Sequence, residues 1–280
     1  MSRNIVKAKL DVIFKKIFGS KDNEDILKDF LSQILEIPIE TIQSITMNNT
    51  ETIPETLTGK FSRMDLKMQL NSDKLINVEI QVKEEPDFRD RTLFYWSKMY
   101  SSELKSGEEY GELKECICIN IINFNMFECG EFHSHFKILE KNRHEVLSDK
   151  LSIHFFELKK INKKANPNNR MELWMQLINA ETEEELEMLE NTNIPTIQKA
   201  VLIIKEMSED EKIQEIARIR EKQMHDEATA IGHAKREGRA EGRAEGITIG
   251  EEKAKSRLIA AMRKNGMSEE QIQQLLKETN

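Results

Sequence analysis

The chain has 280 residues, which is long enough for one sizeable core and an accessory region. Apolar residues make up 38% of it and charged residues 33%, a balance that favours a compact domain joined to long solvated helices and, with several dense apolar segments, excludes a fully disordered chain. The formal net charge of −8 argues against tight DNA binding by the whole surface but leaves room for a local basic groove.

Membrane and export signals are missing from the sequence. No apolar run approaches ~18 residues, so no transmembrane span is expected. The first residues lack the apolar stretch of a signal peptide. Cys116, Cys118 and Cys129 are an odd number of cysteines, and we expect them to be reduced, with a zinc site as the alternative for the first two. These features predict a cytoplasmic protein with no membrane partner.

Two helices are expected at the N-terminus. Apolar residues recur at helical spacing over residues 11–36. Gly19 and Ser20 interrupt this pattern, and the acidic residues at 22–25 suit the start of a second helix. Pro38 is expected to end that second helix.

Three strand-like segments follow, at residues 41–47, 63–70 and 75–83. The last two alternate strictly between apolar and polar residues, and the sequence Asn-Ser-Asp at 71–73 between them has turn chemistry. This pattern predicts a β-hairpin.

The rest of the core is expected to contain a helix at about 87–105, a buried strand at 115–123, a charged strand or loop region and a strand at 151–158. The order α-α-β-β-β-α-β-β predicts a mixed α/β core. A polar break over 162–169 precedes a segment that looks entirely helical, with a long charged helix at about 196–231 and a short helical pair at 256–275. We therefore divide the chain into an α/β core at 1–160, a helical region at 161–225 and a last region at 226–280.

The last region contains a four-residue repeat, with glycine at positions 238, 242, 246 and 250. A glycine costs a helix about 1 kcal/mol relative to alanine, so a compensating gain is expected. A glycine stripe lets another backbone approach closely, and the neighbouring arginine and glutamate residues exclude a membrane. We interpret the repeat as a soluble helix–helix interface that forms a homodimer, with a flexible tether as the alternative.

Acidic residues in the hairpin are candidates for metal binding. The strand period of two places Glu79, Gln81 and Lys83 on one face. If Asp65 pairs with Glu79 across the hairpin, the two carboxylates and the backbone carbonyl of Ile80 offer the hard oxygen ligands that Mg²⁺ prefers. The alternative is an ordinary polar strand face directed at solvent.

Two other polar groups stand out. Arg91, Tyr95 and Lys98, on the helix after the hairpin, are candidates for a phosphate-binding face, with a core helix that carries a solvated stripe as the alternative. His133 and His135 would share one side of a strand, but no third ligand accompanies them at a recognisable spacing, so we expect surface or partly buried histidines there.

The segments GKFSRMD at 59–65 and NVEIQ at 77–81 resemble the PD-(D/E)XK nuclease superfamily. Residues 11–19, 91–95 and 107–110 and the glycine repeat are similar to one branch of it, the Rpn-type recombination-promoting nucleases, also described as putative transposases.

This resemblance implies a restriction-endonuclease-like mixed sheet and a metal-dependent DNA endonuclease linked to recombination or mobile elements. It makes Asp65 and Glu79 the ligands of Mg²⁺ or another divalent cation. Gln81 takes the position of the motif's lysine, so a cation is missing there, and Lys83 is a candidate to supply it. Asp11 is the candidate for an assisting acidic residue on the first helix. The alternatives are a catalytically silent interaction protein with the same fold, and a DNA-binding module that nicks rarely or only with a partner.

Overall fold

The computed structural model describes residues 5–48, 66–104, 107–162, 164 and 166–278. The chain forms two compact units, Met1–Gln223 and Met224–Asn280. Within the described residues no helix has the length and apolarity needed to cross a membrane.

The N-terminal helices begin and end close to the predicted positions. Helix α1 spans Asp11–Phe18 and helix α2 spans Glu24–Leu35, with a 3₁₀ turn at Lys21–Asn23 between them. Gly19 ends α1, and its N–H donates to the Lys15 carbonyl at 2.8 Å. A Cβ at this position would lie 2.7 Å from the same oxygen, which explains why glycine stands there.

The first predicted strand is shorter than expected. A 3₁₀ turn occupies Ile39–Thr41, and strand β1 covers Ile45–Met47. The backbone between these elements bonds to a side chain: Asn71 Oδ1 accepts from the N–H of Gln43 at 2.9 Å, and Asn71 Nδ2 donates to the Thr41 carbonyl at 3.0 Å. An amide from the hairpin turn thus satisfies backbone groups that a strand would have paired in the sheet.

Within the described residues the sheet has six strands, in the order β1-β2-β3-β4-β6-β5. The further strands are β2 Leu66–Leu70, β3 Lys74–Gln81, β4 Glu115–Ile122, β5 His133–Leu139 and β6 Val146–Glu157. The β3–β4 and β4–β6 pairs are parallel and the other three pairs are antiparallel. The predicted hairpin is confirmed as β2 and β3, joined at Asn71, which has a φ of 50°.

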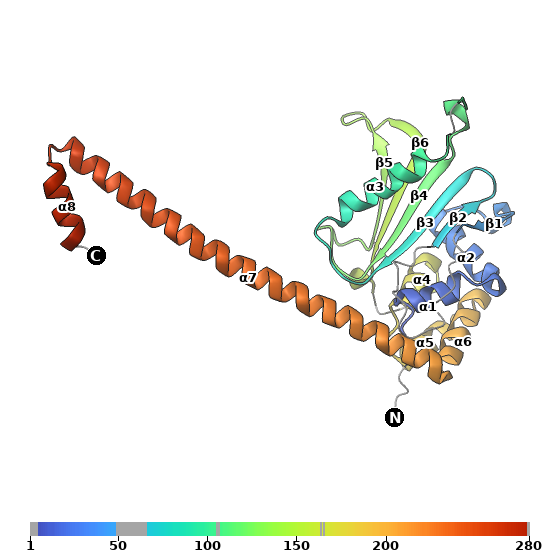
Figure 1. Ribbon diagram of the computed structural model, residues 1–280. Coiled ribbons are helices and arrows are strands. Elements are labelled where there is room, and N and C mark those ends of the chain that lie inside the picture. The colour runs from blue at the N-terminus through green and yellow to red at the C-terminus, as the bar shows by residue number, and fades with distance from the viewer. Residues whose placement is uncertain (1–4, 49–65, 105–106, 163, 165, 279–280) are drawn as a thin grey trace. The chain divides into compact units, whose positions relative to one another are not determined.

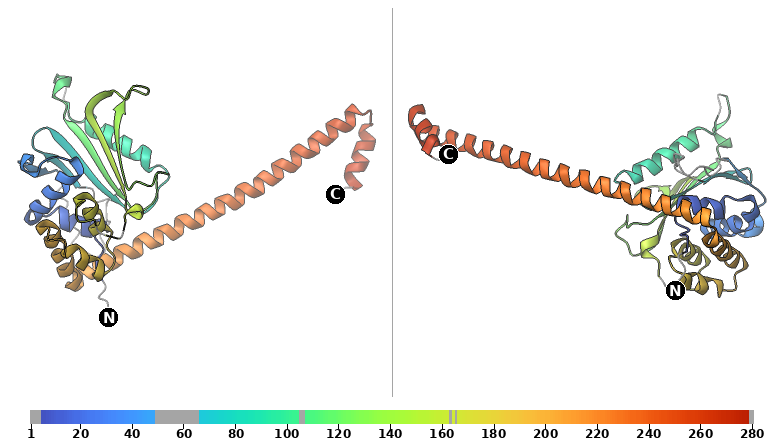
Figure 2. Two further views of the ribbon diagram at one scale, coloured as in Figure 1. Left: turned by 180° about the vertical axis from the view of Figure 1, so that it is seen from behind. Right: turned by 60° about the horizontal axis from the view of Figure 1, so that its bottom comes forward.

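Helices cover both faces of this sheet (Figures 1 and 2). Helix α3, Phe88–Ser101, lies on one face, where Phe88 packs with Cys118 of β4 and Phe155 of β6. Helices α1 and α2 lie on the other face. Helices α4 Arg170–Asn179 and α6 Pro195–Glu209 pack with them, and α5 Glu183–Glu190 packs with α4 and α6. Two further 3₁₀ turns occur at Tyr110–Glu112 and Leu158–Lys160.

Asp29 joins α2 to the later helices. Its carboxylate is 1% exposed and accepts hydrogen bonds from Arg170 at 2.5 Å, Trp174 Nε1 at 3.0 Å and Thr196 Oγ1 at 2.8 Å. Donors from α4 and α6 therefore meet on one buried acceptor of α2, and these helices belong to the same compact unit as the sheet.

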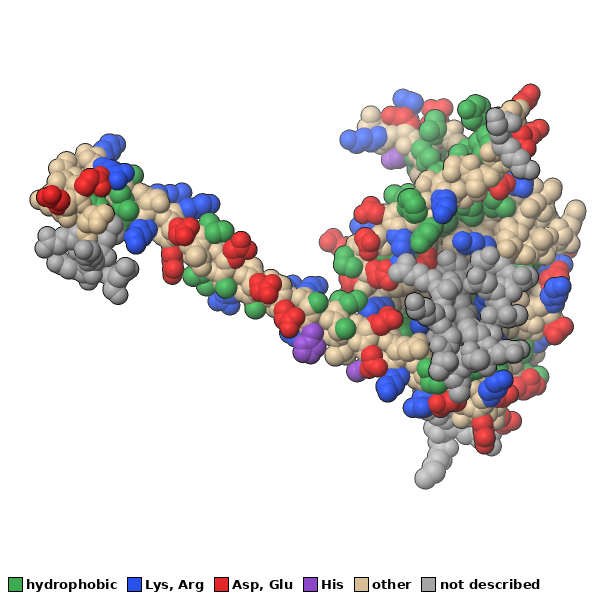
Figure 3. Space-filling model, in the orientation of Figure 1, with side chains coloured by type: hydrophobic (Ala, Val, Ile, Leu, Met, Phe, Trp, Pro, Cys, Tyr) green, Lys and Arg blue, Asp and Glu red, His purple; other side chains and the backbone are tan. Residues whose placement is uncertain are grey.

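The remaining chain is helical, as predicted, but it is divided at other positions. Helix α7 spans Glu211–Lys264 and α8 spans Glu269–Glu278. The break before α7 is at Asp210, whose Oδ1 accepts from the N–H of Lys212 at 2.9 Å and so caps the helix. Helix α7 ends at Lys264, and Gly266 follows with a φ of 83°, as the Asn-Gly sequence predicted. The four repeat glycines continue α7 without a break, and Figure 3 shows acidic and basic side chains mixed along this unit.

Candidate functional site

Glu79 is buried on the sheet face that α3 covers. Strand alternation places Asn77 and Glu79 on this face, with exposed fractions of 6% and 3%. Glu79 lies next to Asn120 in the parallel β3–β4 register, and Asn120 Oδ1 is 3.5 Å from the hydroxyl of Thr92 on α3. A carboxylate this deeply buried requires a compensating positive charge or hydrogen-bond donors.

Arg91 supplies that charge from the first turns of α3. Its Nη2 donates to Glu79 Oε1 at 2.6 Å and lies 3.5 Å from Gln81 Oε1. Its Nη1 is bonded to Glu85, and the guanidinium carbon lies 4.6 Å from the ring centre of Phe88. The Arg91 side chain is 10% exposed, and its Nε is buried with no hydrogen-bond partner. The guanidinium is therefore enclosed between the end of β3 and the start of α3.

Gln81 ends β3 beside this ion pair. Its Nε2 donates to the Lys83 carbonyl at 2.9 Å and to Glu85 Oε1 at 3.1 Å. The side-chain amide is thus oriented by the turn that leads from β3 to α3. Lys83 takes part in this arrangement through its backbone carbonyl.

The structure does not describe Asp65, and it places Asp11 next to an arginine of α7. Asp65 lies outside the described residues, so its pairing with Glu79 stays a prediction; Leu66, which follows it in the chain, pairs with Val78, which precedes Glu79. Asp11 is buried, and its carboxylate accepts from Arg220 Nε at 2.9 Å and Nη2 at 2.7 Å. Glu79 and Asp11 are therefore bonded to two different arginines.

A groove of about 300 Å³ lies between α3 and the start of the β2–β3 hairpin. Lys67 and Lys98 line it together with Asn77 and Tyr95. Asn77 Oδ1 is buried and has no hydrogen-bond partner. Because Asn77 and Glu79 share a face of β3, this groove with two lysines lies on the same side of the sheet as the Glu79–Arg91 pair.

The oxygen atoms around Glu79 are of the type that coordinates a hard cation. They are the carboxylates of Glu79 and Glu85 and the amide oxygen of Gln81, which all lie around the Arg91 guanidinium, and magnesium prefers oxygen ligands. Among the described residues, no group of three or more histidine, cysteine, aspartate or glutamate side chains is placed to hold a metal. The set is chemically suitable for a divalent cation, and its second predicted carboxylate, that of Asp65, lies outside the described residues.

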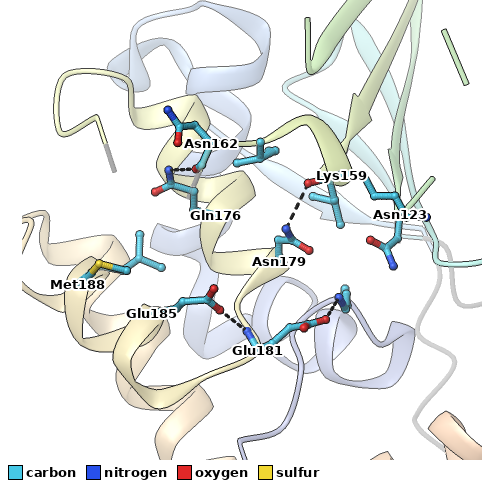
Figure 4. Close-up of a pocket in the computed structure, with 12 residues that line it drawn as sticks. Asn123, Lys159, Asn162, Gln176, Asn179, Glu181, Glu185 and Met188 are labelled. Carbon is cyan, nitrogen blue, oxygen red and sulfur yellow. Dashed lines mark hydrogen bonds and ion pairs between the residues drawn. The ribbon is translucent and has the colours of Figure 1, made fainter. Parts of the chain in front are cut away.

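A larger cavity, of about 330 Å³, lies where β4 and β6 end (Figure 4). Its polar groups largely bond to one another: Lys9 Nζ to Glu181 at 2.5 Å, Gln176 Nε2 to the Asn162 carbonyl at 2.7 Å, and Asn179 Nδ2 to the Leu158 carbonyl at 3.2 Å. These bonds tie α4 and the turn after it to the chain that leaves β6 and to the segment before α1. Neither Glu79 nor Gln81 lines this cavity, so we place the candidate site at the β3–α3 corner.

Three histidines gather on the opposite sheet face. His133 Nε2 lies 3.0 Å from His154 Nδ1, and Ser152 Oγ lies 3.0 Å from His154 Nε2 and 2.7 Å from His135 Nε2. Burial, together with the neighbouring histidines, lowers the pKa of His154 to about 3. Burial also lowers the pKa of His133 and His135. The hydrogen-bonded chain of neutral imidazoles agrees with the expected partly buried histidines.

Two residues of the site were missed in the sequence. Asn77 shares the strand phase of Glu79 and Gln81, so the period of two was sufficient to find it. Glu85 lies in the turn after β3, and no periodicity signals its bond to Arg91.

Comparison with known proteins gives one clear result. A family model described as PD-(D/E)XK nuclease family transposase matches residues 8–234. No curated protein and no solved structure shows a significant match. The matched region includes all six strands, so the predicted α/β fold of this superfamily with a helical C-terminal region is confirmed.

Proposed function

We propose that this chain, which belongs to the PD-(D/E)XK nuclease family of transposases, is a metal-dependent DNA endonuclease that acts in recombination or on mobile elements. The observation that carries the proposal is the buried carboxylate of Glu79, held at the end of β3 beside Gln81 and a guanidinium. A deeply buried carboxylate paired with an arginine is a frequent mark of a functional site.

In this proposal Asp65 and Glu79 hold Mg²⁺ or another divalent cation, with the Ile80 carbonyl as a third oxygen. Such a cation lowers the pKa of a bound water and stabilises negative charge on a phosphodiester. Gln81 orients the attacking water or contacts the scissile phosphate, but an amide cannot take up a proton as a base. Asp11, bonded to Arg220, is assigned an indirect role in this scheme, by positioning α1.

Lys67, Lys98 and Arg91 support DNA as the substrate. Lys67 and Lys98 line a groove on the same sheet face as Glu79, and Lys83 follows the strand that carries Glu79. Side chains of this kind contact phosphates and fix the register of a nucleic acid without selecting its sequence. Two lysines in one groove, which Glu103 also lines, support local binding of an anionic substrate by a chain whose net charge is −8.

Nicking of supercoiled plasmid with and without Mg²⁺ tests the proposal. We expect Asp65→Asn and Glu79→Gln to lower the nicking rate by orders of magnitude, because each removes a direct ligand charge, and Gln81→Ala to lower it less. Asp73→Asn is the matched control, because this exposed aspartate lies in the turn of the same hairpin. Equal nicking by the wild type, Asp65→Asn and Glu79→Gln would refute the assignment.

A catalytically silent protein with the same fold is the second candidate. It is favoured by the glutamine at the motif's lysine position and by the arginine already bonded to Glu79. A silent protein would bind no divalent cation in a direct titration, whereas the nuclease would.

The repeat glycines support a homodimer through α7. Among the described residues, an added Cβ at Gly238, Gly242, Gly246 or Gly250 would meet no atom within 4 Å, so packing within this helical unit does not explain the glycines. Exposed apolar side chains of the same unit, Ile247 and Leu258 among them, lie on α7 as well. We propose that a second copy of α7 packs closely along the glycines, and that the pairs of arginine and glutamate beside them add about 0–1 kcal/mol each.

A further inference from the structure

Two different cations would bind the same carboxylate oxygen of Glu79. The proposed function gives its carboxylate to a divalent cation, and in this structure Arg91 Nη2 donates to Oε1 at 2.6 Å. A dication and a guanidinium at one oxygen would repel each other in a poorly solvated site. The two cations are therefore alternatives.

We propose that Arg91 takes the place of the cation on Glu79 in the metal-free protein, and that metal binding displaces its Nη2 toward the substrate phosphate. The inference rests on the proposed function, since it requires Glu79 to be a metal ligand. Its first basis is burial: at 3% exposure, Glu79 needs a counter-charge whenever no metal is present.

The second basis of the proposal is that Arg91 makes contacts besides its hydrogen bond to Glu79. Nη1 is bonded to Glu85 and the guanidinium carbon lies over the Phe88 ring. These contacts can persist when Nη2 leaves Glu79, so the guanidinium stays beside Gln81, 3.5 Å from Oε1. Gln81 stands where the superfamily motif has its lysine. Arg91 thus supplies, from α3, the positive charge that is missing at position 81.

Arg91 is well placed to supply this charge. Its side chain is enclosed and reaches both Glu79 and Gln81. A guanidinium also presents several N–H groups in a fixed plane, so it can hold Glu85 and a phosphate oxygen at once.

Direct metal titration tests the competition. Mn²⁺ binding is measured by isothermal titration calorimetry on the full chain carrying Arg91→Gln, with Arg89→Gln as the matched control. Arg89 lies on the same helix, but it is exposed and bonds to the Met126 carbonyl near Phe127. We expect Arg91→Gln to bind Mn²⁺ about tenfold more tightly than wild type, because a charged hydrogen bond no longer has to be broken, and Arg89→Gln to bind as wild type does.

Binding of a short fluorescent DNA duplex in Ca²⁺ supplies the second readout. We expect Arg91→Gln to lower DNA affinity about tenfold or more while it raises metal affinity, since a phosphate contact is lost. A merely structural role would lower both affinities together. Arg91→Lys, which keeps a positive charge, should recover part of the DNA affinity; its thermal unfolding midpoint, with that of Arg91→Gln, checks that the variants are folded.

The outcomes separate the two hypotheses. Unchanged or weaker Mn²⁺ binding by Arg91→Gln, with binding abolished in Glu79→Gln, would overturn the role of Arg91 and leave the metal site intact. Wild-type Mn²⁺ affinity in Glu79→Gln, or no binding by wild type and Arg91→Gln, would overturn the proposed metal site and the inference together. If Arg91→Gln does not fold, the same comparison is made with Arg91→Met, which also removes the charged hydrogen bond; tighter Mn²⁺ binding is expected, and unchanged binding counts against the inference.

Discussion

Replacing Asp29 by alanine is expected to destabilise the first unit by about 3 kcal/mol. The buried carboxylate accepts three hydrogen bonds, from Arg170, Trp174 and Thr196. Loss of one partner of a buried charged network costs about 3–5 kcal/mol. The lower end applies here because the Arg170 side chain is 40% exposed and can be rehydrated, while the buried Trp174 Nε1 loses its acceptor.

Urea unfolding monitored by tryptophan fluorescence measures this effect. Asp25→Ala is the matched control, because Asp25 lies on the same helix and pairs with Lys199 at 2.6 Å, but its side chain is 53% exposed. That pair is expected to contribute about 0–1 kcal/mol. If Asp29→Ala and Asp25→Ala lost the same small free energy of unfolding, α4 and α6 would not be held to α2 as the contacts indicate.

Three further measurements follow from the structure. The His154 pKa of about 3 lies below the unfolded value of 6.5, so the unfolded chain binds the proton more readily and stability present above pH 6.5 is lost as the pH falls toward 3. Between pH 3 and pH 6.5, His154 changes the free energy of unfolding by about 1.4 kcal/mol per pH unit. Urea unfolding of His154→Gln should therefore show a flatter dependence of this free energy on pH, whereas the exposed control His144→Asn should keep the wild-type dependence. The double variant Gly242→Ala with Gly246→Ala should stabilise the helix by about 1 kcal/mol per site, seen as higher helicity in circular dichroism, and should lower the particle mass measured by sedimentation. Gly232→Ala, outside the repeat, should leave the mass unchanged. An unchanged mass in the double variant would argue for a tether. Truncation after residue 225 should leave a folded unit, because the first unit ends at Gln223, and reduce the mass by light scattering to that of a monomer.

Local chemistry predicted much of the fold. The turn at 71–73, the break at Gly19 and the end at Gly266 were accessible because each depends on the conformational preferences of a few adjacent residues. The sequence does not distinguish a strand from a loop at β5, because this edge strand has mostly exposed residues with no alternation in burial. The split at Asp210 was missed because it falls within a run of charged residues that looks the same inside a helix or at its start.

The candidate site was predictable only along β3. The period of two places Asn77, Glu79 and Gln81 together, but it does not say which face a helix will cover. The bond between Glu79 and Arg91 depends on how α3 crosses the sheet, which is a tertiary property. The sequence therefore predicts Arg91 as a phosphate contact but does not predict its bond to Glu79.

Glu79 differs in one respect from Glu157, the other buried glutamate of the described sheet strands. Glu157 accepts from the backbone N–H groups of Met126 at 2.5 Å and Phe127 at 3.2 Å, and from Lys160 at 2.5 Å. Backbone donors cannot leave unless their loop is rebuilt, so this carboxylate is fixed by the fold.

Arg91 can leave Glu79 by a side-chain movement while it keeps Glu85 and Phe88. We therefore expect Glu157→Gln to lower the free energy of unfolding by about 1–3 kcal/mol and to leave Mn²⁺ affinity unchanged. Glu79→Gln should abolish Mn²⁺ binding by calorimetry. Equal loss of Mn²⁺ binding in both variants would mean that burial of a glutamate, and not its position beside a displaceable arginine, determines the effect.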